Sequence, residues 1–179
     1  ASDTLFEQNF CDNLQNPNAA QYASGFMLSG GANNITFRNN IVRSYCGINT
    51  GGTGNANHLY IYGNLFVNNL TFNPYPEGVG LEYTPYAIVK NNIFYDQPLY
   101  PIFARYNITG VDIDYNLAYN SDGTRPRCVY LFNLSSCQPT PNHEIWGVNP
   151  LFINPAAYDF HLQVSSPAID AGANLSGVV

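Results

Sequence analysis

The sequence predicts an all-β chain folded as a right-handed parallel β-helix, a solenoid of about five to seven rungs with about 24 residues in each. Three observations predict this fold class: a short unit recurs, an asparagine returns at one fixed place in it, and no segment has the 3.6-residue hydrophobic period of a helix. Right-handedness follows from the crossover rule for parallel strands. We expect one domain over 1–179, with rungs over about 3–122, a disulfide loop over about 123–142 and a closing segment over 143–179.

The repeated unit reads apolar, any, apolar, any, any, Asn and then two apolar residues. Four clear copies, ITFRNNIV, LYIYGNLF, AIVKNNIF and VDIDYNLA, begin at Ile35, Leu59, Ala87 and Val111, and a fainter copy, TLFEQNFC, begins at Thr4. The register asparagines, which hold the fixed place in each copy, are Asn9, Asn40, Asn64, Asn92 and Asn116, with spacings of 31, 24, 28 and 24 residues. The longer spacings contain obvious loops.

Each unit begins with a short strand, because apolar residues alternate with period two before the asparagine. The asparagine ends this strand at a corner, since Asn tolerates left-handed backbone and bonds its own main chain. The apolar pair after it starts a second strand, and stretches such as NTGGTGNAN and NPYPEGVG form the turns between rungs. Rungs stack about 4.8 Å apart, so we expect the asparagines to form a ladder. An antiparallel sandwich of short strands is the alternative, but it gives no reason for the fixed register.

The segment NPLFINPAAYDFHLQVSSPAIDAG, from Asn149 to Gly172, departs from the repeat. It resembles the segment that commonly closes the solenoid in secreted and surface-anchored right-handed parallel β-helix proteins of the pectate-lyase-like superfamily, where the pattern is DPLF…DFHLQ…SPAIDAG. Asn149 stands where that family usually has Asp, and the sequence ends in ANLSGVV where the family continues toward a further strand and a surface anchor. The resemblance implies the β-helix architecture rather than one activity.

Composition argues against several partners. Only 10% of residues are charged, against about 25% in an average soluble domain. The net charge is -6 and the sequence pI is about 4.7, so we expect neither nucleic acid nor an anionic membrane surface as a partner. No apolar run approaches the roughly 18 residues needed to cross a bilayer. The first residues, ASDTLFEQNF, have no basic n-region and no apolar h-region, so we expect any secretion signal to have been removed already. The expected location is extracellular or at the cell surface.

Four cysteines in a chain that is expected to be secreted favour disulfides over metal binding. We expect Cys128 to bond Cys137 and Cys11 to pair with Cys46 across successive rungs, with two buried thiols as the alternative for the second pair. The chain also contains five N-x-S/T sequons, which are candidates for glycosylation. They begin at Asn34, Asn69, Asn107, Asn133 and Asn174.

Outward side chains of successive rungs are expected to form columns. The column two residues before the register asparagine contains Glu7, Arg38, Tyr62, Lys90 and Asp114. The column four residues before it contains Leu5, Thr36, Tyr60, Ile88 and Asp112. Lys90 is therefore expected one rung from Asp114 and beside Asp112.

This cluster suggests a polysaccharide lyase acting on uronic-acid polymers. Removing the proton beside a sugar carboxylate requires a base and a cation that neutralises the carboxylate. In this interpretation Lys90 is the base, Asp112 and Asp114 hold Ca²⁺, and Arg38 pairs with the substrate. Pectate and alginate lyases of the resembled superfamily use outward acids, Ca²⁺ and a Lys or Arg on this fold.

Three other interpretations of this face stay open. A glycoside hydrolase would use Asp112 and Asp114 as an acid and base about 7 Å apart along the strand. Tyr60 and Tyr62 are candidates for sugar stacking in any glycan-binding interpretation. Alternatively, Lys90 and Asp114 form only an exposed pair worth about 0–1 kcal/mol.

The scarcity of charge favours a structural function over a catalytic groove. The first rung begins by Thr4 with no room for a cap, and an uncapped rung exposes strand edges and core. Either the chain is a piece of a longer solenoid, or this open end pairs with another copy. We therefore expect an extracellular β-helical subunit that associates end to end as a filament, surface layer or adhesin. Its expected partners are copies of itself and extracellular glycans. No cofactor or metal is expected, with Ca²⁺ entering only in the lyase interpretation.

Overall fold

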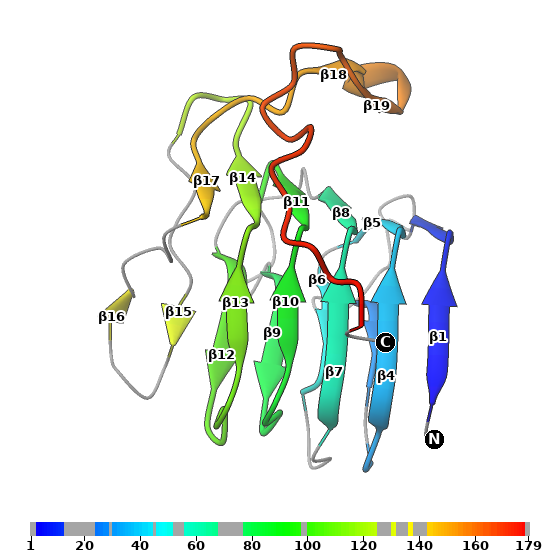
Figure 1. Ribbon diagram of the computed structural model, residues 1–179, viewed down its shortest axis with the longest axis vertical. Coiled ribbons are helices and arrows are strands. Elements are labelled where there is room, and N and C mark those ends of the chain that lie inside the picture. Colours follow the sequence, from blue (N-terminus) through cyan, green and yellow to red (C-terminus); the bar gives the residue numbers. More distant parts are fainter. Residues whose placement is uncertain are drawn as a thin grey trace, which may run out of the picture.

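The chain forms a parallel β-helix in the computed structural model (Figure 1). The structure describes residues 3–12, 24–28, 30–44, 46–51, 56–67, 77–97, 100–124, 130–131, 136–137 and 143–177. Three sheets run along the solenoid, and each full rung contributes one strand to each sheet. From the first to the fifth strand of sheet A the chain makes four turns, slightly fewer than the five to seven expected.

The strands follow the order that the repeat predicts. Sheet A contains β1 (Thr4–Glu7), β4 (Asn33–Arg38), β7 (Asn57–Tyr62), β10 (Ile88–Lys90) and β13 (Asp112–Asp114). Sheet B contains β2 (Phe10–Asp12), β5 (Ile41–Arg43), β8 (Leu65–Val67), β11 (Ile93–Tyr95), β14 (Leu117–Tyr119) and β17 (Ile145–Trp146). Sheet C contains β3 (Ser24–Met27), β6 (Cys46–Asn49), β9 (Glu77–Glu82), β12 (Tyr100–Arg105), β15 (Tyr130–Leu131) and β16 (Ser136–Cys137). Neighbouring strands are parallel except β15 and β16, which pair antiparallel.

The core lies between the three sheets and is built from stacked inward columns. Phe37 stacks on Phe6 with 4.8 Å between ring centroids, and Phe66 stacks on Phe94 at 5.0 Å. Sheet C gives these rings room through inward glycines: a β-carbon at Gly78 would lie inside the van der Waals surface of the Phe94 ring. The aromatic size of the sheet B column therefore requires glycine in the sheet C strand of the preceding rung.

The corner between sheets A and B differs in one detail from the prediction. The left-handed residue is the one before each register asparagine, with φ of 56°, 56°, 65°, 57° and 59° along the solenoid. These corner residues are Gln8, Asn39, Gly63, Asn91 and Tyr115. The register asparagines themselves do not adopt a positive φ. Their side chains turn inward, and those from Asn40 to Asn116 are buried. Asn64 does bond its own main chain: its Nδ2 donates to the Tyr62 carbonyl at 3.2 Å.

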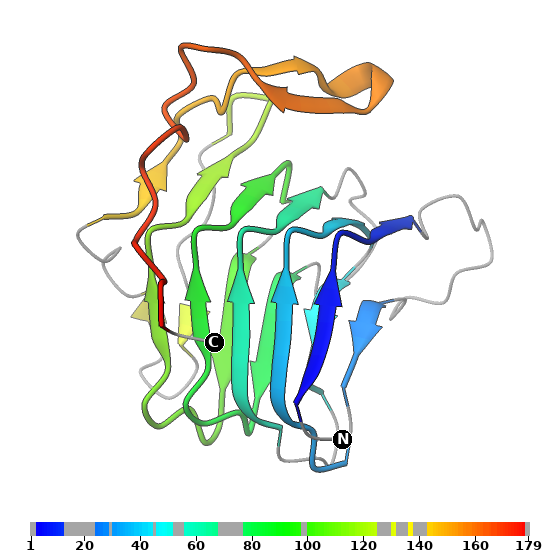
Figure 2. The same cartoon turned by 45° about the vertical axis from the view of Figure 1, so that its right-hand side comes forward.

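The carboxy-terminal segment packs against the outer face of sheet B. After β17 it forms a hairpin of β18 (Phe152–Asn154) and β19 (Asp159–Leu162), joined by a 3-10 turn at Pro155–Ala157. Phe152 packs with Leu65 and Val67 in a second apolar cluster. Figure 2 shows the hairpin folded back over the strands of sheet B. The segment expected to close the solenoid thus extends along its side, because the outward residues of sheet B are apolar and need a cover. No helix in the described parts of the chain is long and apolar enough to span a membrane.

Candidate functional site

The outward columns of sheet A lie where the repeat predicts them. Lys90 is the register partner of Asp114 on one side and of Tyr62 on the other. Ile88 pairs in the same way with Asp112 and with Tyr60. The predicted neighbourhood of Lys90 is therefore confirmed at the level of strand register, which supports the rung assignment from the asparagines.

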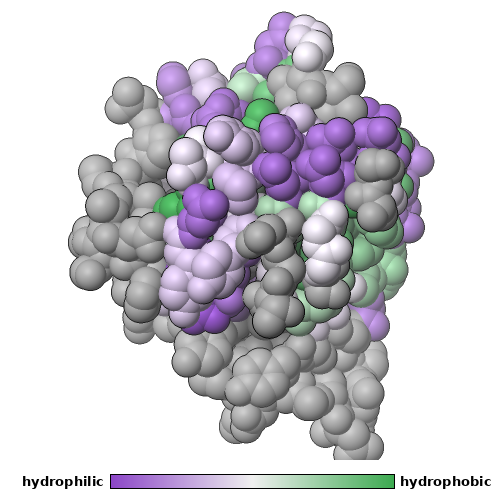
Figure 3. All heavy atoms as spheres, turned by 90° about the horizontal axis from the view of Figure 1, so that it is seen from below, coloured by the Kyte–Doolittle hydropathy of each residue, from purple (hydrophilic) through white to green (hydrophobic). Residues whose placement is uncertain are grey.

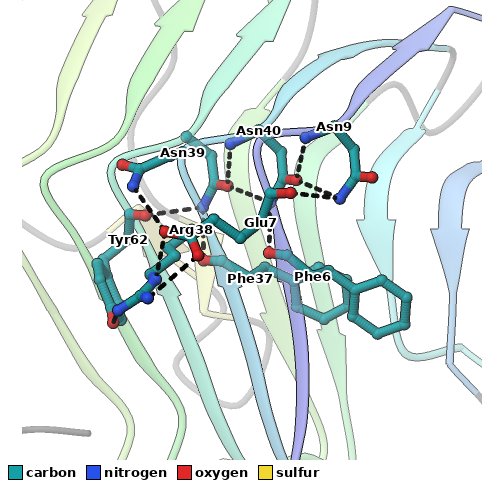
Figure 4. Close-up of polar contacts among 9 residues, drawn as sticks. Phe6, Glu7, Asn9, Phe37, Arg38, Asn39, Asn40 and Tyr62 are labelled. Atoms are coloured by element: carbon teal, nitrogen blue, oxygen red, sulfur yellow. Dashed lines mark hydrogen bonds and ion pairs between the residues drawn. The ribbon is translucent and has the colours of Figure 1, made fainter.

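Two ion pairs hold four of the five charged side chains of these columns. Arg38 binds Glu7 through two contacts, Nε to Oε1 at 2.8 Å and Nη2 to Oε2 at 3.1 Å (Figure 4). Its Nη1 lies 3.5 Å from the Tyr62 hydroxyl. Lys90 Nζ lies 2.6 Å from Asp112 Oδ2. Lys90 therefore forms its ion pair diagonally with Asp112 rather than with its register partner Asp114, which lies in the same strand as Asp112. The hydrogen bonds from Arg38 lower the pKa of Glu7.

Asp114 is bound instead by a histidine that lies outside the repeat. His143 Nδ1 is 2.8 Å from Asp114 Oδ2, and the His143 backbone N–H donates to Asp114 Oδ1 at 3.2 Å. The His143 ring stacks on Tyr115 at 4.2 Å. Burial raises the pKa of Asp114, but the bonds from His143 and from the Tyr115 N–H outweigh it, so the pKa is lowered overall. Asp114 is thus an anchored carboxylate.

The arrangement is better suited to holding rungs together than to binding an ion. Asp112 and Asp114 are two carboxylates already engaged by Lys90 and His143, whereas Ca²⁺ takes six to eight oxygen ligands. Among the described residues no group of three or more His, Cys, Asp or Glu side chains converges. Arg38 lies two rungs from Lys90, with Tyr62 between them. The residues therefore do not fit the Ca²⁺ site of the lyase interpretation.

Exposed aromatic rings gather at the turns from sheet C to sheet A rather than at Tyr60 and Tyr62, which are half-buried. Tyr83 stacks on Tyr106 at 4.6 Å, and Tyr86 stacks on His58 at 5.2 Å. Seen from below, the described residues of this face are mostly hydrophilic or of intermediate hydropathy, with a more hydrophobic area at the right-hand side (Figure 3). Each of these rings stacks its face on another ring, so the pairs stabilise the turns as the stacked aromatic rings stabilise the sheets.

The register asparagines form the predicted ladder, which is buried from Asn40 to Asn116. Each asparagine donates its backbone N–H and its Nδ2 to the Oδ1 of the asparagine in the next rung. Asn40 bonds Asn64 at 3.0 and 2.9 Å, and Asn92 bonds Asn116 at 3.0 and 3.0 Å. Nδ2 also donates to a carbonyl one rung back, as Asn64 does to Phe37 at 2.9 Å. The side chains thus bind each rung to both of its neighbours.

The ladder ends on Glu144, which the repeat search missed. Asn116 donates its N–H to Glu144 Oε2 at 3.0 Å and its Nδ2 to Oε1 at 2.9 Å. Burial, reinforced by the charge of Asp114, raises the pKa of Glu144 to about 7, and the two bonds from Asn116 offset this only in part. The sequence carries the signal: Glu144 follows Asn116 by 28 residues and precedes two apolar residues, Ile145 and Trp146.

The cysteine prediction is wrong for Cys11, which is a free thiol. Its Sγ lies 3.6 Å from the Gly25 carbonyl, and its strand pairs with β5 of sheet B while Cys46 lies in sheet C. The expected Cys11 to Cys46 disulfide is therefore not formed. Cys128, and the side chain of Cys137, lie outside the described residues.

The candidate glycosylation sites differ in their surroundings. Asn107 and Asn174 are exposed, whereas Asn34 Nδ2 donates to Asp3 Oδ1 at 3.1 Å. Asn69 and Asn133 lie outside the described residues. Glycosylation at any of the five stays a prediction.

The first rung presents an apolar end. Leu5, Phe10 and Met27 are 50%, 58% and 53% exposed, one on each sheet. On the inner side of the same rung lie Phe6 and Phe26, which are only partly buried although their rings pack at 5.4 Å. Further along the column of Phe10, the hairpin packs against the sheet B residues, so the exposure is confined to the first rung.

Two features of these surfaces bear on function: a face on sheet A whose charges are paired, and an apolar end at the first rung. Comparison with known proteins adds no family to them. No protein-family model, no curated protein and no solved structure matches the chain.

Proposed function

We propose that the chain is an extracellular or cell-surface structural subunit that associates with copies of itself through the ends of its β-helix. The observation that carries this proposal is the apolar end of the first rung, where Leu5, Phe10 and Met27 are exposed and the inner Phe6 and Phe26 are only partly buried. Among the described residues, no strand pairs with the free edges of β1, β2 and β3. Apolar surface and open strand edges together favour addition of another rung.

The outer face of sheet A supports a structural rather than a catalytic function. Glu7, Arg38, Lys90 and Asp112 neutralise each other in two ion pairs. An active groove for an acidic polymer needs cations that are free to meet the substrate carboxylates. Ion pairs between successive rungs instead strengthen stacking, as the asparagine ladder does.

Sedimentation velocity tests the proposal directly. We expect the wild-type chain to sediment as oligomers whose size rises with concentration, and electron micrographs to show end-to-end assemblies. Phe10→Glu places a charge on the apolar end and should leave a monomer. Ile153→Glu is the matched control, because Ile153 is 57% exposed and belongs to β18 rather than to the first rung. A wild-type chain that stays monomeric at every concentration would refute the proposal.

A second candidate function, a polysaccharide lyase domain of the pectate-lyase-like superfamily, is supported by the resemblance of the closing segment. It is also favoured by the gathering of Lys90, Asp112, Asp114 and His143 on one face. In that reaction a base removes the proton beside the sugar carboxylate while the glycosidic oxygen leaves, which creates an unsaturated sugar. Incubation with uronate polymers, followed by absorbance of that product, tests it. Activity lost in Lys90→Ala would replace the structural proposal.

A further inference from the structure

The asparagine ladder has a direction, so its two ends are chemically different. Every register residue donates toward the next rung and accepts from the previous one. At the start, Asn9 donates to Asn40, while its own Oδ1 receives no hydrogen bond from any described residue and points away from the ladder in Figure 4. At the far end, the backbone N–H of Glu144 has no acceptor among the described residues, while its carboxylate accepts from Asn116.

The backbone repeats this polarity. The carbonyl of each register residue accepts from the N–H that follows the next register residue: Ile41 donates to Asn9 at 2.9 Å, and Ile145 donates to Asn116 at 2.8 Å. By the same rule the Glu144 carbonyl faces onward as an acceptor, and the Phe10 N–H faces backward as a donor. The two ends of the ladder are therefore complementary in their side chains and in their backbone.

We propose that copies join head to tail, with the first rung of one copy stacked on the corner 143–147 of another, so that Glu144 stands in the ladder directly before the partner's Asn9. The proposal rests on the self-association proposed above and adds its direction and register. The Glu144 N–H donates to the partner's Asn9 Oδ1, and the Glu144 carbonyl accepts from the partner's Phe10 N–H. Because the two contacting surfaces differ, such joints repeat and extend into a filament.

Glu144 also makes the joint sensitive to pH. At every internal step a side-chain Nδ2 supplies a second hydrogen bond to the next Oδ1. An ionised Glu144 carboxylate has no hydrogen to donate, so it faces the Oδ1 of the partner's Asn9 as one acceptor against another. A protonated Glu144 carboxyl donates its O–H to that oxygen. The titratable groups around Glu144 are Asp114, whose charge opposes ionisation, and the neighbouring His143. The joint therefore strengthens as Glu144 takes up a proton. The pKa of Glu144, raised to about 7 mainly by burial, lies between pH 5 and pH 8.

Glu144→Asn tests the register by a gain of function. Asparagine restores the ordinary ladder residue, accepts from Asn116 and supplies the missing Nδ2 donor. One added hydrogen bond should tighten self-association about tenfold at pH 8, measured by sedimentation equilibrium, and should remove most of its dependence on pH between 5 and 8. Wild type should associate more tightly at pH 5 than at pH 8. Because misfolded chains can also aggregate, the gain counts only where sedimentation fits a reversible equilibrium between monomer and oligomers.

Two variants of Asn9 complete the test. Asn9→Ala and Asn9→Asp lose the same donated bond to Asn40, but only alanine loses the acceptor oxygen. Placed in the Glu144→Asn chain, Asn9→Ala should abolish the tenfold gain, and Asn9→Asp should keep it. If Glu144→Asn gives no gain, or if the gain survives Asn9→Ala, the register is wrong while self-association stands. If no variant associates at any pH from 5 to 8, self-association itself is refuted.

Discussion

Replacing Glu144 by glutamine should change how the stability of the monomer depends on pH. Burial is the largest cause of the raised pKa of Glu144, and the Asp114 charge adds to it. The pKa rises from an ordinary 4.5 to about 7, so the folded state holds the proton more tightly than the unfolded state. Glutamine stays neutral at all these pH values and keeps an oxygen that accepts from Asn116.

The sign and size of the effect follow from this shift. The stabilisation from a protonated Glu144 is fully present below pH 4.5 and is lost as the pH rises through about 7. Each unit of pKa shift corresponds to about 1.36 kcal/mol, so the loss is up to about 3 kcal/mol. The lowered pKa of Asp114 acts in the opposite direction, but only below its ordinary value of 3.8, outside this range.

Urea unfolding at pH 5 to 8.5 measures this difference, with Trp146 fluorescence as the probe and the protein dilute enough to be monomeric. The free energy of unfolding of wild type, relative to Glu144→Gln, should fall by up to about 3 kcal/mol across the range. The comparison with glutamine cancels titrations common to both chains. A wild-type stability that stays level with the variant, or rises above it with pH, would contradict the raised pKa of Glu144.

Three further substitutions test the packing. Asn64→Ala removes a buried side chain with hydrogen bonds to both neighbouring rungs and should lower the free energy of unfolding by about 3 kcal/mol in urea titrations; a cost below about 1 kcal/mol would contradict a cooperative ladder. Gly78→Ala should cost about 2 kcal/mol or more in the same assay, because its methyl group would overlap the Phe94 ring; an unchanged midpoint would contradict this packing. Tyr158→Ala removes the ring that lies 4.1 Å from the Arg43 guanidinium, so amide hydrogen exchange in the β18–β19 hairpin should speed up while the rungs keep their protection.

The stacking order of this protein was predictable because the fold repeats its geometry and the sequence repeats its asparagine. Once Asn40 and Asn64 are assigned to one corner, the register of the strands before and after them follows by counting. This is why Lys90 was placed correctly beside Asp112 and Asp114. The choice between these two carboxylates was not predictable, since both lie within reach of the lysine and the outcome depends on a third residue, His143, that engages Asp114.

Glu144 was not predicted because it takes the place of a register asparagine with a different residue type. The ladder requires an acceptor in register, and Glu144 meets this requirement with a carboxylate. A search for asparagine alone therefore stops one rung early. The Cys11 prediction was wrong for a related reason: adjacency in rung order does not fix which sheet a residue occupies, and Cys46 lies in sheet C.

The apolar pair after each register asparagine determines which surfaces of sheet B remain available to a partner. In a three-residue strand one member of the pair points inward and the other outward, so an apolar pair repeated at Ile41, Leu65, Ile93 and Leu117 gives sheet B a second apolar face. The hairpin packs against part of this outer column, around Phe152. Phe10, at the head of the same column, remains 58% exposed. A rung of another copy stacked on β2, as the proposed head-to-tail association requires, would place further chain beside Phe10.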